Sequence, residues 1–278
     1  MPEGDTVYRT AALLDRALSG RVLERADLRV PRHATADLSG AAVLATVPCG
    51  KHLLTRFDLD GALLTLHTHL KMEGVWRVHR PGARWERPGH TARAVLLAGP
   101  PLDRRGAPVE AVGFSLGAVD LLATAAESDV VGHLGPDLLA PEWDEHLAAR
   151  AVDRLQASPH RPLRSALLDQ TNLAGIGNVY AAELCYLAGL HPETPVGEVA
   201  DLATIVDQAQ RLLTLNRDRP RRVTTADPRA PTWVYSRGGQ PCRRCGTRIR
   251  SSSSGDVPGR ERISYWCPTC QPPSGSDR

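Results

Sequence analysis

The chain has 278 residues, of which 42% are hydrophobic and 23% are charged, so packed globular domains are expected and wholesale disorder is not. No apolar run approaches the ~20 residues that a membrane-spanning helix needs, and the first residues lack the basic start and apolar stretch of a signal peptide. A cytoplasmic protein without a membrane partner is therefore expected, and the net charge of +3 only weakly indicates an acidic partner.

The first predicted element is a helix over residues 5–20. Apolar side chains recur at helical spacing from Val7 to Leu18, which is typical of a helix with one buried face. Asp5 or Thr6 is the predicted N-cap, because a short side-chain oxygen can accept a hydrogen bond from the free N–H groups of a first turn.

Seven strand-like runs follow this helix and continue to about Leu122. Turn residues separate them at roughly ten-residue intervals, a spacing that predicts an antiparallel sandwich or barrel. The runs cover residues 21–30, 41–50, 51–59, 62–70, 74–79, 92–99 and 109–117.

The second half of the chain is predicted to be helical, with helices over residues 141–156, 162–170, 179–190 and 199–216. Residues 216–235 contain three prolines and several arginines without a clear period, so a basic, mobile loop is predicted there. The composition changes divide the chain into predicted domains at residues 1–124, 125–230 and 231–271, followed by a disordered tail at 272–278.

Four of the six cysteines form two chelating pairs near the C-terminus. Cys242 and Cys245 are separated by two residues, as are Cys267 and Cys270, and 21 residues lie between the pairs. Four thiolates in this arrangement suit one tetrahedral Zn²⁺ and leave no open coordination position, so a structural zinc ion is predicted rather than a catalytic one. A redox pair and a chance pairing of the cysteines are the alternatives.

The cysteine segment is also basic. Residues 237–278 contain eight arginines and three acidic residues, a formal charge of +5, from which four thiolates around one Zn²⁺ subtract two. Such a charge on a small hairpin favours contact with phosphates, and a solvated module that only adds stability is the alternative.

Arginine supplies nearly all of the positive charge elsewhere. Lys51 and Lys71 are the only lysines among 34 basic residues. A lysine in so arginine-rich a chain can exchange a proton, which a guanidinium cannot do at neutral pH. From composition alone, the alternative that both lysines are exposed residues without a function is equally open.

Three segments, in this order, resemble the formamidopyrimidine-DNA glycosylase/endonuclease VIII family: the start MPEG, the internal LAGIGNVYAAE and the ending QPCRRCGTRIR…YWCPTC. Each is weak alone, but together they are specific, and the resemblance runs from Pro2 to Cys270. It implies an α+β multidomain fold. The expected parts are an N-terminal catalytic β-sandwich with a leading helix, a helical domain with a helix–two-turn–helix element, and a C-terminal zinc-finger β-hairpin.

The resemblance implies that Pro2 is the nucleophile once removal of Met1 frees its secondary amine. An α-amino group titrates at about 8, so a useful fraction is unprotonated at neutral pH. Attack on C1′ of a deoxyribose would displace the damaged base and leave an iminium ion. Glu3 would protonate the opening sugar ring as general acid, and Lys51 occupies the position of the family's β-elimination lysine.

Further residues are implied to contact DNA. Arg262 matches the hairpin arginine that contacts phosphates and assists δ-elimination, with Arg260 as a nearby competitor. Asn178 matches the phosphate-binding asparagine of the helix–two-turn–helix element, and an ordinary helix cap is its alternative. Met72, beside Lys71, matches an apolar side chain that fills the gap left by a flipped nucleotide, with a core position as the alternative.

Several histidines attract attention as well. His90 is predicted to be a further DNA contact. His67 and His69 alternate on one strand face and could mimic a metal pair, but no third ligand is evident, so structural or phosphate-contacting roles are favoured. A structural role is predicted for His133.

Two departures favour the endonuclease VIII-like branch, which acts mainly on oxidised pyrimidines such as thymine glycol and 5-hydroxyuracil. The purine-directed branch begins Pro-Glu-Leu-Pro-Glu, whereas Thr6 replaces the second glutamate here, and the segment PLDRRGAPVEAVGF lacks that branch's phenylalanine. Lys71 and Glu73 differ from the endonuclease VIII pattern of glutamine and tyrosine, so single-stranded or bubble DNA is an alternative to duplex DNA.

The sequence therefore predicts a bifunctional DNA glycosylase and AP lyase of base excision repair, which nicks DNA by β,δ-elimination through a Pro2 Schiff base. A nucleoid-associated monomer without a small-molecule cofactor is expected. A non-catalytic or purine-directed damaged-DNA-binding member of the same fold is the alternative. An RNA-binding zinc ribbon is poorly supported, because only 4% of the residues are aromatic.

Overall fold

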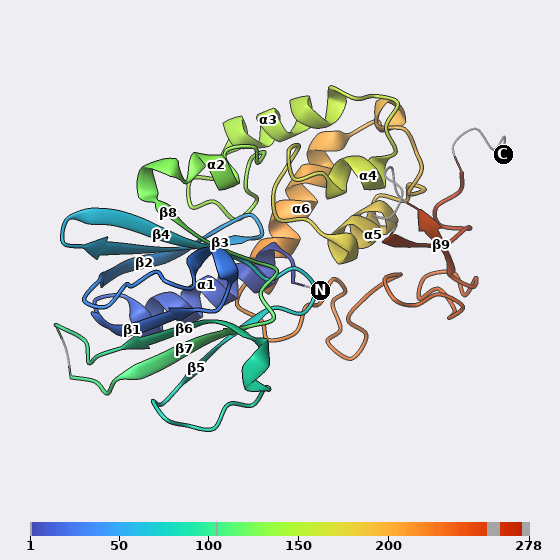
Figure 1. Cartoon of the computed structure of the whole chain (residues 1–278). Helices are drawn as coiled ribbons and strands as arrows, with labels where there is room; N and C mark the ends of the chain where they lie inside the picture. Colours follow the sequence, from blue (N-terminus) through green and yellow to red (C-terminus); the bar gives the residue numbers. More distant parts are fainter. Residues whose placement is uncertain (1, 104, 255–261, 274–278) are drawn as a thin grey trace. The chain divides into compact units, whose positions relative to one another are not determined.

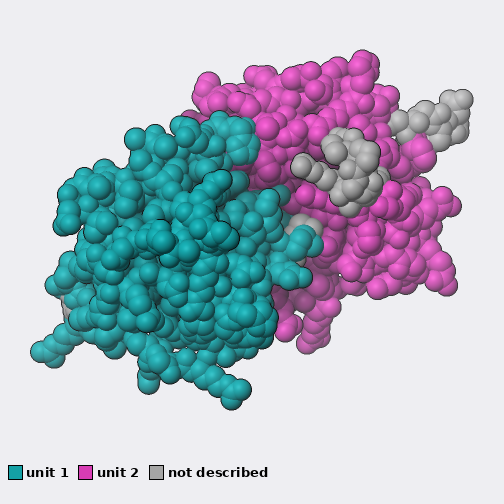
Figure 2. Space-filling model, in the orientation of Figure 1, with its two compact units in different colours: residues 1–133 teal, residues 134–278 magenta. Residues whose placement is uncertain are grey.

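The computed structural model describes residues 2–103, 105–254 and 262–273. The chain divides into two compact units, which we call unit 1 (residues 1–133) and unit 2 (residues 134–278), coloured separately in Figure 2. The helices and strands are labelled in Figure 1. Among the described residues, no helix combines the length and apolarity that crossing a membrane requires.

Unit 1 is a β-sandwich, which decides between the two architectures that the sequence left open. One antiparallel sheet has the strand order β2-β3-β4-β8 and the other β1-β6-β7-β5. The strands are β1 (Leu23–Leu28), β2 (Ala42–Cys49), β3 (His52–Leu59), β4 (Ala62–His69), β5 (Val75–His79), β6 (Ala92–Ala98), β7 (Val109–Phe114) and β8 (Ala118–Ala123).

Helix α1 (Gly4–Leu18) supplies part of the sandwich core. Its buried face, which includes Val7, Leu14 and Leu18, packs in one apolar cluster with side chains of both sheets. The helix begins one residue before the predicted start, and the predicted N-cap at Asp5 or Thr6 is wrong. Glu3 is the N-cap through its backbone, because its carbonyl accepts the first hydrogen bonds of the helix.

Strand β8 was not predicted as a separate element. It follows β7 after a turn in which Ser115 has φ 48°, and it completes the first sheet by pairing with β4. A short segment then covers the end of unit 1, where Arg56 and Glu127 form a two-point ion pair with distances of 2.8 and 2.7 Å. The short helices of unit 1 are η1 (Pro31–His33), η2 (Gly89–Thr91), η3 (Thr124–Ala126) and α2 (Ser128–Val131).

Unit 2 is built around helix α5 (Asn178–Leu187), as expected for an apolar segment that lacks a polar face. Every residue of it from Asn178 to Tyr186 is buried. All four predicted helices are present. The other helices of unit 2 are α3 (Glu145–Gln156), α4 (Leu163–Leu168), η4 (Val196–Glu198) and α6 (Leu202–Asn216).

The segment after α6 is held in place, contrary to the mobile loop that its composition suggested. The Asn216 side chain accepts a hydrogen bond from the Val223 N–H at 2.7 Å and donates one to the Val223 carbonyl at 3.0 Å. The fully buried Glu183 carboxylate of α5 accepts from the Thr224 hydroxyl and from the N–H groups of residues 233, 234 and 235. These long-range hydrogen bonds order a segment whose sequence shows no helical or strand periodicity.

The C-terminal hairpin consists of β9 (Arg250–Ser254) and β10 (Arg262–Trp266), paired antiparallel. A small apolar core that includes Tyr186 of α5 and Ile249 joins the hairpin region to the helices. Residues 274–278, which make up most of the predicted tail, lie outside the described residues. So does Arg260, the competitor of Arg262.

Candidate functional site

The N-terminal candidates stand directly before α1. Pro2 is half-buried, whereas the Glu3 side chain is fully buried. The Glu3 carbonyl accepts hydrogen bonds from the N–H groups of Thr6 at 2.9 Å and Val7 at 3.0 Å, so the first residues are fixed by the helix that they begin. Helix α1 packs against strands β2 and β3, which places these residues on the sandwich rather than on a free arm.

Lys51 lies in the tight turn that joins β2 to β3. Gly50 before it has φ 55°, a left-handed conformation that a residue without a Cβ adopts at little cost. The ladder register pairs Cys49 with His52 across this turn, and the Lys51 side chain is half-buried. The turn therefore presents the lysine at the end of the β3–β4 ladder.

Lys71 and Met72 form a turn at that same end of the ladder, because His52 is paired with His69. Lys71 has φ 51° and donates its backbone N–H to the Nδ1 of His69 at 2.9 Å. The lysine stem crosses Gly117 so closely that a Cβ there would lie 2.1 Å from the Lys71 Cγ. The Met72 side chain is 64% exposed, so a core position, the alternative to an intercalating role, does not apply.

Four imidazoles gather beside these two turns, and we call His52, His67, His69 and His133 the imidazole cluster. The Nδ1 of His52 lies 2.8 Å from the Nε2 of His67, whose Nδ1 lies 3.3 Å from an Asp120 carboxylate oxygen. The rings of His52 and His67 stack at 5.0 Å, those of His52 and His69 meet edge-on at 4.9 Å, and those of His52 and His133 are 6.1 Å apart.

The hydrogen bonds of the cluster require His67 and His69 to be neutral, because each of these rings uses one nitrogen as an acceptor. With Asp120 as acceptor, His67 carries its proton on Nδ1, so its Nε2 accepts from the Nδ1–H of His52. Burial, followed by the charges of neighbouring groups, lowers the pKa of His52 to about 3 and that of His69 to about 4. Sequence reasoning singled out His67 and His69 but missed His52, whose place follows only from the β3–β4 register.

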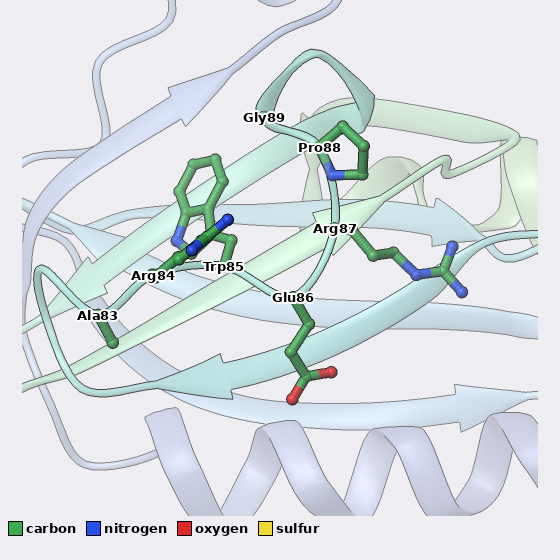
Figure 3. A pocket seen from close by; sticks show the side chains of 7 residues that line it. All are labelled: Ala83, Arg84, Trp85, Glu86, Arg87, Pro88 and Gly89. Carbon is green, nitrogen blue, oxygen red and sulfur yellow. The ribbon is translucent and has the colours of Figure 1, made fainter.

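His90 lies on the other sheet, in the connection between β5 and β6, where its side chain is exposed. Residues 83–89 of this connection line an open hollow of about 500 Å³, and Figure 3 shows Trp85 and Arg87 projecting from opposite sides of the loop. Trp85 donates to Glu110 at 2.7 Å, and Arg87 donates to the carbonyl of Glu73 at 3.2 Å. The second bond joins this basic loop to the turn that carries Met72.

In unit 2, the structure brings Asn178 and the start of β10 together. Asn178 is the first residue of α5, and its side-chain Nδ2 donates to the Ile263 carbonyl at 2.9 Å. Its Oδ1 accepts from Nη2 of the buried Arg164, which also lies 3.2 Å from the Arg262 carbonyl. The Arg262 side chain is exposed. Sequence reasoning did not single out Arg164.

The four cysteines of the hairpin region converge on one point. Their sulfur atoms all lie within 4.8 Å of one another, with 3.4 Å between Cys245 and Cys267 and 3.9 Å between Cys242 and Cys270. Ligands at about 2.3 Å around a tetrahedral ion are separated by about 3.8 Å, so the group could bind a metal ion. Hydrogen bonds from Thr247 lower the pKa of Cys245 to about 6, whereas burial raises the pKa of Cys267 and of Cys270.

Comparisons with known proteins place this geometry in a family. The formamidopyrimidine-DNA glycosylase N-terminal domain matches residues 1–102, and the helix–two-turn–helix domain of formamidopyrimidine-DNA glycosylase matches residues 134–216. A probable endonuclease 8 2 of Streptomyces coelicolor is 53% identical, over 98% of this chain and 94% of that protein. A DNA-(apurinic or apyrimidinic site) lyase Nei2 of Mycolicibacterium smegmatis is 47% identical, over 98% of this chain and 99% of that protein.

Solved structures confirm the fold. The formamidopyrimidine-DNA glycosylase of Lactococcus lactis, in a complex with DNA that contains an N7-benzyl-Fapy-dG, superimposes with a TM-score of 0.74 at 22% identity. The alignment covers 98% of this chain and 100% of that chain. The predicted β-sandwich with a leading helix, the helical domain and the four-cysteine hairpin are therefore confirmed as the architecture.

Proposed function

Because this chain belongs to the formamidopyrimidine-DNA glycosylase family, we propose that it is a bifunctional DNA glycosylase and AP lyase whose nucleophile is the amine of Pro2. The enzyme class, a DNA glycosylase and AP lyase of base excision repair, follows from the family and from relatives named endonuclease 8 or DNA-(apurinic or apyrimidinic site) lyase. One observation supports the assignment of residues most strongly. Pro2, Glu3 and Lys51 are all present within the matched N-terminal domain, so no member of the proposed machinery has been lost.

The chemistry begins after Met1 is removed. The Pro2 nitrogen attacks C1′ of the damaged nucleotide, and the bond to the base breaks with its electron pair leaving on the base. The nitrogen loses its proton, which neutralises the departing base. Glu3 then protonates the sugar-ring oxygen as the nitrogen lone pair opens the ring, and the product is an iminium ion between Pro2 and C1′. The burial of the Glu3 side chain and its place at the N-cap of α1 support this role, because they fix it beside the nucleophile.

Strand cleavage then consists of two eliminations. Loss of the C2′ proton, acidified by the iminium ion, breaks the C3′–O bond, and the phosphate leaves with the electron pair. Loss of the C4′ proton next breaks the C5′–O bond and releases the second phosphate. Lys51 holds a flanking phosphate and transfers a proton, and Arg262 contacts the phosphates during the second elimination.

DNA that carries an oxidised base is the proposed substrate, and oxidised pyrimidines are the preferred class. Thr6 stands where the purine-directed branch has glutamate, and the Streptomyces coelicolor relative carries an endonuclease 8 name. Met72 fills the space that the flipped nucleotide leaves, which its exposure supports. Lys71, His90 and Asn178 contact the backbone of duplex DNA, with single-stranded or bubble DNA as the alternative substrate.

The metal ion is proposed to be one structural Zn²⁺ held by Cys242, Cys245, Cys267 and Cys270. The four-sulfur donor set and its spacing suit zinc, and four protein ligands leave no position for a reacting water. When bound by both cysteine pairs, which flank the hairpin in the sequence, the ion would hold β10, which carries Arg262, in place.

Borohydride trapping tests the proposed nucleophile. Zinc-loaded protein is mixed with duplexes that contain an abasic site, thymine glycol or 8-oxoguanine, and a reduced covalent adduct is expected with the first two. The adduct should disappear when Met1 is retained, because the Pro2 nitrogen is then part of a peptide bond, and it should form more slowly in Pro2→Gly, which exposes a primary amine in place of the proline ring. Intact protein that forms no adduct would identify a non-catalytic damaged-DNA-binding member, and faster trapping on 8-oxoguanine would identify a purine-directed one.

A further inference from the structure

Arg164 lies at a junction between three segments of unit 2. It belongs to the short helix α4, and only 2% of its surface is exposed. Its Nη2 lies 2.7 Å from Asn178 Oδ1, 3.2 Å from the Arg262 carbonyl and 3.5 Å from the Ile263 carbonyl. The same cation therefore contacts the start of α5 and the first two residues of β10.

The asparagine completes this junction. Asn178 Nδ2 donates to the Ile263 carbonyl at 2.9 Å while its Oδ1 accepts from Arg164. The amide oxygen thus bonds to α4 through Arg164, and the amide nitrogen bonds to β10 through Ile263. The planar guanidinium has fixed donor directions, and its hydrogen bonds are strengthened by charge and by burial. A shift of β10 along α5 would stretch two of these bonds together.

The junction holds the backbone of the residue proposed to act in the second elimination. The side chain of Arg262 is exposed, and hydrogen bonds reach its carbonyl and the next one. Asn178, a proposed phosphate contact, is fixed by the same guanidinium. The same guanidinium therefore contacts both the Asn178 side chain and the backbone that carries the Arg262 side chain.

We propose that Arg164 is a positioning residue, which fixes Asn178 and Arg262 relative to each other so that the second phosphate is released efficiently. This inference rests on the proposed function. With protein in excess, so that a weakened Asn178 contact does not limit DNA binding, the first elimination depends on Pro2 and Lys51 of unit 1 and not on the junction. The second elimination depends on Arg262, so it requires the junction to be intact.

The test compares Arg164→Lys and Arg164→Met with Arg161→Lys. Arg161 belongs to the same segment but forms its own ion pair with Asp169 at 2.6 Å, so Arg161→Lys is the matched control. A 5′-labelled duplex with an abasic site separates the two products, a 3′ unsaturated aldehyde after β-elimination and a 3′ phosphate after δ-elimination. Zinc content, thermal unfolding and borohydride trapping are measured on every variant.

We expect both Arg164 variants to form the trapped adduct and the β product at nearly the wild-type rate. The ratio of δ to β product should fall by about tenfold, less than the ~100-fold loss that a 1 Å misplacement can cause, and it should fall more in Arg164→Met than in Arg164→Lys. The control should keep the wild-type ratio. An unchanged ratio in zinc-loaded Arg164→Lys, or a fall matched by an equal loss of trapping, overturns the inference.

The wild-type arm separates this inference from the proposed function. Absence of a trapped adduct in the wild type contradicts the Pro2 mechanism itself. A wild type that traps normally but stops at the β product leaves the Pro2 mechanism standing and overturns the role of the junction.

Discussion

Acidification is expected to destabilise unit 1 through the imidazole cluster. Burial lowers the pKa of His52 to about 3, with further contributions from the charges of His69, His67, His133 and Lys71. In the unfolded chain the same imidazole titrates at about 6.5. Between these two values the unfolded chain binds a proton that the folded chain does not, so stability is fully present above pH 6.5 and is lost as the pH falls below it.

The expected size of this effect follows from the two pKa values. At pH 5 the unfolded imidazole is about 1.5 pH units below its pKa, and each unit corresponds to about 1.4 kcal/mol, so His52 alone costs the folded state about 2 kcal/mol. The ring is partly exposed, and solvent screening reduces the cost to about 1–2 kcal/mol. Asp120, which favours a charged His67, opposes the effect at one end of the cluster.

The assay compares the wild type with His52→Asn at pH 7 and pH 5. An asparagine amide can donate to His67 Nε2 in place of the His52 Nδ1–H, so the variant removes the titration and keeps a donor. Urea unfolding is followed by pulsed hydrogen exchange in β3 and β4, since a whole-chain signal would mix two units.

The wild type should lose about 1–2 kcal/mol more than the variant between the two pH values. His160→Asn, at an exposed site, is the control and should behave like the wild type. Equal losses in the wild type and His52→Asn would refute the account of the cluster as neutral in the folded state.

Three further predictions concern the turn, the helix core and the metal group. Met72→Ala should change the free energy of unfolding by less than about 0.5 kcal/mol, because the side chain is exposed, yet slow base excision from duplex DNA in single-turnover assays; unchanged excision would contradict the void-filling role. Glu183→Gln should destabilise unit 2 by about 3 kcal/mol, because the buried carboxylate accepts from Thr224 and three backbone N–H groups, and a wild-type melting curve would count against that account. Chelation should remove one zinc per chain and weaken DNA binding, measured by metal analysis and fluorescence anisotropy; binding that survives complete removal would show that the ion does not support the hairpin.

The parts of the fold that the sequence could predict are those determined by interactions between residues close together in the chain. Helices such as α3 and α6 were predictable because their apolar spacing is local. The sequence did not predict β8 as a strand distinct from β7. The turn between them depends on Ser115 at positive φ, a conformation that is uncommon for serine and that its residue type does not predict. The order of the segment after α6 was unpredictable, since Glu183 is reached from 41 to 52 residues away.

The candidate site shows the same division. Pro2, Lys51 and the four cysteines could be singled out as candidates because each stands in a short motif, the cysteines by their spacing and the other two by resemblance to a known family. His52 and Arg164 were not, because their roles come from partners that only folding brings near. His52 meets His67 through strand register, and Arg164 meets the Arg262 backbone across 98 residues of chain.

The division of the chain after residue 133 has a consequence for its synthesis. Unit 1 is continuous in sequence, and its last strand, β8, is complete at Ala123. Domains generally fold as units in the order in which the ribosome releases them. The half that carries the amine of Pro2 can therefore reach its folded state before Asn178, Arg262 and the four cysteines have been made. A nascent chain with only unit 1 folded would then lack the groups proposed for phosphate contact, for the second elimination and for zinc binding.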